Sequence, residues 1–120
     1  MARQITNNLG TVSIGDEVLA TLAGVAATEC YGIVGMASRR VKDGIAELLG
    51  RENLSKGVEV AFDQERVSIK LHIVVGYGTR ISEVARNVCD QVKYVVEQAT
   101  GLVVDRIDIF VQGVKVGETK

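Results

Sequence analysis

Residues 58–75 read VEVAFDQERVSIKLHIVV, the strongest β-hairpin pattern in the chain. Apolar and polar residues alternate on both sides of the central DQER, which is the period of a strand with one buried face. The apolar positions are Val58, Val60 and Phe62 before it, and Val67, Ile69, Leu71, Ile73 and Val75 after it. We therefore predict two antiparallel strands joined by a turn at Asp63–Arg66, with one face covered and the other facing water.

Helical and β patterns alternate on either side of this hairpin. The predicted helices cover Asp16–Cys30, Arg39–Leu49 and Ser82–Thr100, and further predicted strands cover Thr11–Ile14, Ile33–Val34 and Leu102–Val111. The order β-α-β-α-β-β-α-β predicts an α+β fold, a two-layer sandwich whose mixed β-sheet carries the helices on one face. We expect residues 1–120 to form a single domain, with about residues 1–9 as a loose N-terminal segment.

The first and last predicted helices differ in their faces. The last helix has an ordinary apolar stripe of Val84, Val88, Val92, Val95 and Ala99. The first helix places Val18, Leu22, Val25 and Ala26 on one face, and only small uncharged residues on the other. Because a surface helix normally has a charged side, we expect this helix to be covered on both faces or packed against another copy of the protein. The small residues singled out as an interaction face are Ala20, Ala23, Gly24 and Ala27.

Gly76-Tyr77-Gly78, between the long strand and the last helix, resembles a phosphate-binding loop. A dinucleotide fingerprint requires a third glycine where this chain has Ile81, and a P-loop requires Gly-Lys-Ser/Thr where it has Gly-Thr-Arg. The segments Ser13–Val18 and Thr79–Val84 share one scheme, a hydroxyl residue followed at a fixed distance by Glu-Val. We therefore interpret the loop as a turn followed by a helix cap, and expect no nucleotide and no other cofactor.

Other candidate chemistry is sparse. His72 is the single histidine and is predicted to face solvent, with no carboxylate partner close in sequence. Cys30 and Cys89 lie in apolar helical segments and are predicted to be buried thiols, without metal-ligand spacing. A net charge of −1 argues against nucleic-acid binding. A basic cluster is formed by Arg39, Arg40, Lys42, Arg51 and Lys56. It is interpreted as a solvated face, or alternatively as a site for an acidic partner or anionic lipid headgroups, with Arg39, Arg40 and Lys42 as the possible acidic-partner patch. We expect no catalytic residue and no enzymatic activity.

Localisation is predicted from the absence of two patterns. The chain has no basic segment followed by an apolar one, as a signal peptide would have. Its longest apolar helical stretch, Val18–Ala27, is shorter than the roughly 20 residues that span a bilayer. We expect a cytoplasmic protein that does not insert into the membrane directly.

Two stretches carry a resemblance to a known family. They are VSIGDEVLATLAGVAATECYGIVGM, residues 12–36, and GYGTRISEVARNVCDQVKYVVEQATGLVVDRIDIFVQGV, residues 76–114. The second is the more specific, with Tyr77-Gly78 before the helix and Thr100-Gly101 after it. Together they resemble the alkaline-shock-protein family of Gram-positive bacteria, also called the general-stress or envelope-stress-response family. The resemblance covers about residues 10–116.

The resemblance implies a function but transfers no catalytic residue. It implies a non-enzymatic stress-response protein that acts as a self-associating scaffold or adaptor and is a homo-oligomer. It also implies that a small membrane-anchored partner can bring the protein to the membrane. The alternative that it implies is a regulator of fatty-acid synthesis, which would bind a soluble enzyme or a metabolite of lipid synthesis.

Overall fold

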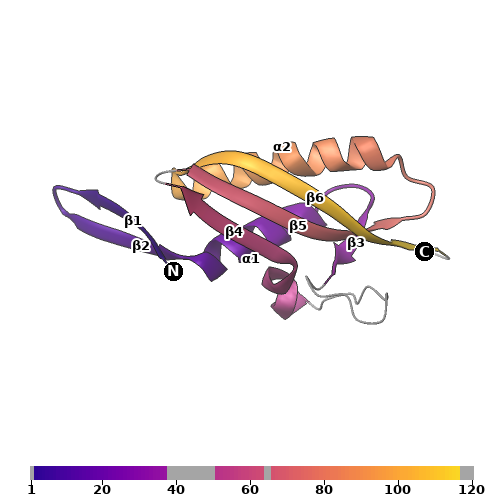
Figure 1. Ribbon diagram of the computed structural model, residues 1–120, viewed down its shortest axis with the longest axis horizontal. Helices are drawn as coiled ribbons and strands as arrows, with labels where there is room; N and C mark the ends of the chain where they lie inside the picture. The colour runs from indigo at the N-terminus through magenta and orange to yellow at the C-terminus, as the bar shows by residue number, and fades with distance from the viewer. Residues whose placement is uncertain (1, 38–50, 64–65, 117–120) are drawn as a thin grey trace.

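The β-sheet is built around its longest buried strand, β5 (Arg66–Gly76). The structure, a computed structural model, describes residues 2–37, 51–63 and 66–116. β4 (Val58–Asp63) pairs with β5 in antiparallel register, so the predicted hairpin is confirmed. β6 (Val103–Lys115) runs parallel to β5 along its whole length. β3 (Ile33–Met36) therefore shares the edge occupied by β4 and pairs with the second half of β5 (Figure 1).

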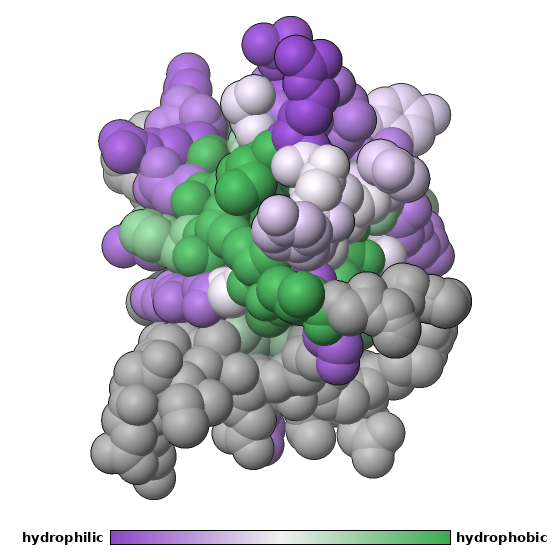
Figure 2. Space-filling model, turned by 90° about the vertical axis from the view of Figure 1, so that its right-hand side faces the viewer, coloured by the Kyte–Doolittle hydropathy of each residue, from purple (hydrophilic) through white to green (hydrophobic). Residues whose placement is uncertain are grey.

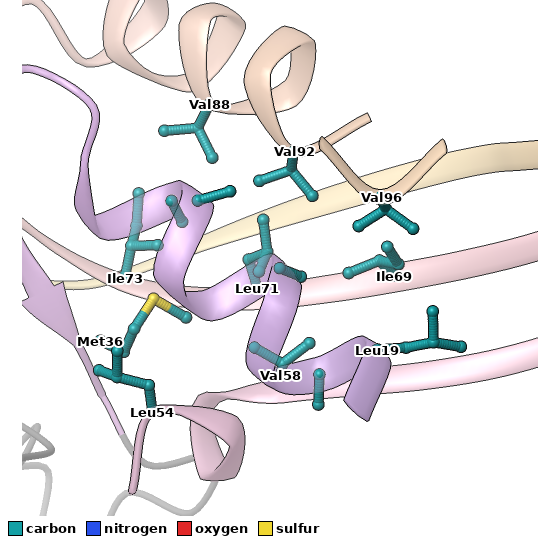
Figure 3. Packing of buried hydrophobic residues seen from close by; sticks show 14 of the residues in the cluster. Leu19, Met36, Leu54, Val58, Ile69, Leu71, Ile73, Val88, Val92 and Val96 are labelled. Atoms are coloured by element: carbon teal, nitrogen blue, oxygen red, sulfur yellow. The ribbon is translucent and has the colours of Figure 1, made fainter. Parts of the chain in front are cut away.

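Both described α-helices cover one face of this sheet, as the α+β sandwich predicts. Alternate residues of β5 are completely buried beneath α1 (Asp16–Thr28) and α2 (Ile81–Thr100). Figure 3 shows Val88, Val92 and Val96 of α2, together with Leu19 of α1, gathered over Ile69, Leu71 and Ile73. Full burial of each such aliphatic side chain contributes about 1.5–3 kcal/mol, so this layer supplies most of the apolar stabilisation.

The ends of α2 follow from its sequence. Val84, Val88, Val92 and Val96 recur every four residues and form the buried stripe. Gly101 ends the helix in the left-handed conformation with φ 78°, and its amide donates to the Glu97 carbonyl at 2.9 Å. The Glu97 side chain then accepts a hydrogen bond of 2.9 Å from the Val104 amide, which ties the helix end to the start of β6.

The apolar stripe predicted for α1 is rotated relative to the observed one. Val18 is 53% exposed, whereas the small residues predicted for the opposite face are buried. The buried residues of α1 are Leu19, Ala20, Ala23, Gly24, Ala26 and Ala27. The prediction was wrong because it ranked residues by size. Small side chains allow close approach of two elements, and η1 (Arg51–Gly57), a 3₁₀ helix, packs directly against this face at Gly24.

The N-terminal residues form a hairpin where we expected a loose segment. β1 (Ala2–Asn7) pairs antiparallel with β2 (Gly10–Gly15), which contains the predicted strand Thr11–Ile14. Figure 1 shows this hairpin projecting beyond the end of the main sheet. The prediction missed β1 because it has no run of alternating apolar residues; its backbone is ordered by the ladder to β2. The helix predicted over residues 39–49 lies outside the described residues.

Candidate interaction site

The small-residue face of α1 is internal to the chain. Ala23 and Ala27 are 0% exposed and Ala20 is 6% exposed, so the proposed interaction face of Ala20, Ala23, Gly24 and Ala27 is not a surface. A Cβ added at Gly24 would lie 3.2 Å from Leu54 Cβ and 3.3 Å from the Leu54 carbonyl oxygen. The small-residue face is therefore covered by the same chain, but the helix is not covered on both faces, because Val18 on its other side is 53% exposed.

The basic cluster is described only in part, because Arg39, Arg40 and Lys42 lie outside the described residues, whereas Arg51 and Lys56 lie in η1. Its interpretation as a solvated face or an acidic-partner patch stays a prediction. The alternative function in lipid synthesis therefore rests on the sequence alone.

The Gly76–Gly78 segment is a turn, as predicted, but its hydroxyl residue does not cap the helix. Gly78 has φ +91°, and the Thr79 hydroxyl donates a hydrogen bond of 2.8 Å to the Gly76 carbonyl. The N-cap residues are Arg80 before α2 and Gly15 before α1, and neither makes a side-chain cap hydrogen bond. The acidic residues expected in the first turns are present, with Glu17 in α1 and Glu83 in α2, where they favour the positive helix end.

His72 is buried, which corrects the prediction that it faces solvent. Its residue exposure is 7%, because the ring of Phe110 stacks on it with centroids 5.0 Å apart. The hairpin brings Glu59 Oε2 to 3.1 Å from His72 Nε2, and β6 brings Gln112 Nε2 to 2.8 Å from His72 Nδ1. A carboxylate only accepts hydrogen bonds, so Nε2 carries the proton and Nδ1 accepts from the Gln112 amide. Both ring nitrogens are occupied by protein groups, and this cluster joins β4, β5 and β6.

The two cysteines are free and half-buried, where we predicted buried thiols. Burial raises the pKa of the Cys30 thiol, and the nearby Glu29 carboxylate adds to the effect. Burial also raises the pKa of the Cys89 thiol, and the negative charges of Asp90 and Asp108 raise it further. Low thiolate content makes both groups poor nucleophiles at neutral pH.

A pH dependence of stability follows from these shifts. A thiol whose pKa is higher in the folded state stabilises the fold fully below its unfolded pKa, about 8.5. That contribution is lost as the pH rises through this value to the folded pKa. We expect the urea midpoint to fall above about pH 8.5, and to fall less in a Cys30→Ala/Cys89→Ala variant. Equal slopes for the two proteins would show that the thiols do not contribute.

Residues 2–37, 51–63 and 66–116 hold no group of three or more His, Cys, Asp or Glu side chains that is arranged to bind a metal ion. Within the same ranges, no helix has the length and apolar character needed to cross a membrane.

The outer edge of β6 is the longest open strand edge among the described residues. β6 is 13 residues long, and β5 is the strand with which it pairs in the part of the chain that the structure describes. Its other edge therefore presents backbone N–H and C=O groups that a further strand can pair with. The strand also carries exposed apolar side chains: Val103, Phe110, Val111 and Val114. We call this feature the β6 edge.

An apolar patch lies at the end of the molecule where β6 finishes. The Tyr77 amide donates to the Lys115 carbonyl at 2.9 Å, so the turn before α2 and the end of β6 are adjacent. Figure 2 shows apolar surface gathered at this end. The exposed apolar residues that its elements carry are Val34, Tyr77, Ile81, Val114 and Val116. A contiguous apolar surface of this kind is typical of a protein interaction site.

An open sheet edge, helices on one face of the sheet and an apolar end characterise this small α+β domain. The chain belongs to the alkaline shock protein 23 family, which has a cell envelope-related function, and matches it over residues 4–116. The resemblance predicted from the sequence is therefore confirmed.

Relatives of nearly the same length occur in two genera. YloU of Bacillus subtilis is 50% identical over 117 residues, covering 97% of this chain and 98% of YloU. Spy1614 of Streptococcus pyogenes is 39% identical, covering 97% of each chain. Among solved structures, the MamM CTD in its copper form has a TM-score of 0.51 at 12% identity, covering 87% of this chain and 91% of that one. At this identity the likeness concerns the fold alone.

Proposed function

We propose that this protein is a non-enzymatic scaffold or adaptor that associates with itself and with other proteins in its cell envelope-related function. The β6 edge carries the proposal. The outer edge of this 13-residue strand offers backbone donors and acceptors to a partner strand. Natural proteins usually shorten or cover such an edge unless it is used for binding.

The surroundings of the β6 edge support the same proposal. Val111 and Val114 are 38% and 47% exposed, and Val114 belongs to the apolar patch at the end of the sheet. The buried His72 of the sheet is by contrast held by partners inside the chain, between Glu59 and Gln112. The surface thus offers apolar contact and backbone pairing as its means of recognition.

A location at the membrane would follow from the partner. The described helices are too short or too polar to cross a bilayer, so we propose peripheral association through a small membrane-anchored protein bound to this scaffold. Such a partner would supply the anchor, and this chain would supply the interaction surface.

The mass in solution tests the self-association directly. Sedimentation velocity over a wide range of concentrations should give species larger than the 12.9 kDa chain, with a population that increases with concentration. A mass that stays at 12.9 kDa at every concentration would overturn self-association.

A further inference from the structure

We propose that the partner at the β6 edge is a second copy of this chain, paired antiparallel with β6 about a two-fold axis through Ile107. This inference rests on the proposed function, because it names the contact by which the scaffold associates with itself. It would join two sheets into one continuous sheet. The strand order, the charges of β6 and the groove beside α2 each support it.

Two bulges limit the regular part of the β6 edge. In the pairing with β5, Val67 lies opposite Val104 but Ser68 lies opposite Arg106, so Asp105 is an extra residue. Ile73 lies opposite Val111 but Val74 lies opposite Gly113, so Gln112 is a second one. A bulge bends a strand and interrupts a regular ladder. The regular segment available to a partner strand is therefore residues 106–111.

Charge complementarity selects one register for this segment. Arg106 and Asp108 lie on the same side of β6, where Arg106 Nε donates to both Asp108 carboxylate oxygens at 3.1 Å. Paired residues in an antiparallel ladder share a face, so a two-fold axis at Ile107 places Arg106 opposite the partner's Asp108, and Asp108 opposite the partner's Arg106. An axis at Asp108 would oppose two like charges, which is destabilising. An axis at Ile109 would oppose Asp108 to the partner's Phe110.

The remaining contacts fit the same axis. Residues 106–108 of the two copies would form the regular ladder, and residues 109–111 would run beside the partner's bulged stretch 103–105. Val103 and Val111, which would then lie near each other, are both exposed in the single chain. A shallow groove of about 250 Å³ runs beside Asp105, Arg106 and Ile107 and is closed on its other side by Asp90 and Lys93 of α2. Because the axis is perpendicular to the sheet, both copies keep their helices on the same face. The groove and the neighbouring α2 surface would then become part of the contact.

Charge exchange tests the proposed register. Arg106→Asp and Asp108→Arg each place like charges opposite one another twice, so each should weaken the dimer by roughly tenfold or more. The double variant Arg106→Asp/Asp108→Arg restores complementary pairs and should dimerise like the wild type. An equimolar mixture of the two single variants should form a heterodimer, because one edge is then acidic and the other basic. The matched control Lys56→Asp changes an exposed charge on η1, which precedes β4 on the side of β5 opposite to β6, and should leave the mass unchanged.

Disulfide formation provides a second readout that does not depend on charge. In a Cys30→Ala/Cys89→Ala background, Ile107→Cys places two thiols opposite each other across the axis, within reach of a disulfide. We expect rapid cross-linking for Ile107→Cys, and slow cross-linking for Ile109→Cys, which would lie beside the partner's bulge at Asp105 and away from the partner's residue 109. Circular dichroism confirms that each variant is folded.

The outcomes separate this inference from the proposed function. The register is overturned, while self-association stands, if the wild type is an oligomer and the charge exchanges leave the mass unchanged. Faster cross-linking of Ile109→Cys than of Ile107→Cys has the same consequence. A wild-type chain that is monomeric at all concentrations overturns both. Restoration of the dimer by the double exchange supports both.

Discussion

Ala23→Glu is expected to unfold the protein. Ala23 is completely buried on the small-residue face of α1, inside the core formed by α1, α2 and β5. An uncompensated charge at a buried position costs about 4 kcal/mol or more, which is a large part of the 5–15 kcal/mol (roughly) that stabilises a domain of this size. Urea denaturation followed by circular dichroism measures the loss, as a lowered midpoint or the absence of a folded baseline.

Thr21→Glu is the matched control for this prediction. Thr21 lies on the exposed side of the same helix, two residues away, so its stability should stay within about 0.5 kcal/mol of the wild type. The pair of variants also distinguishes a core from an interface. If Ala23→Glu were folded, as stable as the wild type and merely smaller in mass, the small-residue face would be a contact between copies, and the packing of α1 described above would be wrong.

Gly32→Ala is the substitution with the second largest expected effect. Gly32 follows α1 with φ +90°, a conformation that side chains rarely adopt. A Cβ there would lie 2.6 Å from Cγ2 of Val84, a buried residue of α2. Backbone strain of about 1–2 kcal/mol and overpacking of about 1–3 kcal/mol should together lower the free energy of unfolding by roughly 3 kcal/mol. Chemical denaturation measures this difference.

The variant Gly78→Ala separates the cost of backbone strain from the cost of overpacking. Gly78 has nearly the same backbone angle, φ +91°, but a Cβ there would meet nothing within 4 Å. This variant should therefore lose only the backbone part, about 1–2 kcal/mol. Adding Val84→Ala to Gly32→Ala should remove the clash, so the double variant should lose less than the sum of the two single losses. Equal losses at Gly32 and Gly78, with additive behaviour at Val84, would contradict the contact between Gly32 and α2.

The central sheet could be predicted from the sequence because its signal is local and periodic. Val67 to Val75 alternate in a run long enough to define a strand, and the preceding strand fixes their partner. Val84, Val88, Val92 and Val96 likewise mark the buried side of α2, with Gly101 at its end. In these segments the large apolar residues are the buried ones. Their spacing alone therefore predicts each helix or strand and the face that it buries.

The sequence-based predictions failed at residues whose burial depends on contacts with distant parts of the chain. Ala20, Ala23, Gly24 and Ala27 are buried because η1 packs closely against them, which residue size along the helix does not predict. His72 is buried because Phe110, 38 residues further along the chain, stacks on its ring. The bulges of β6 also lie outside any sequence pattern that we used, since they are defined by the register with β5. The candidate interaction site therefore moved from α1 to the β6 edge.

Backbone amide hydrogen exchange of β6 tests the central claim most directly, because it reports on the strand edge itself. In the native, unmodified chain, amides of residues 106–111 that point away from β5 have no strand partner in the single described chain. If a second copy pairs there, their protection factors should increase with protein concentration, while the buried amides of β5 stay constant. Exchange of these β6 amides that remains fast and independent of concentration, in a protein that sediments as an oligomer, would contradict the β6 edge as the contact.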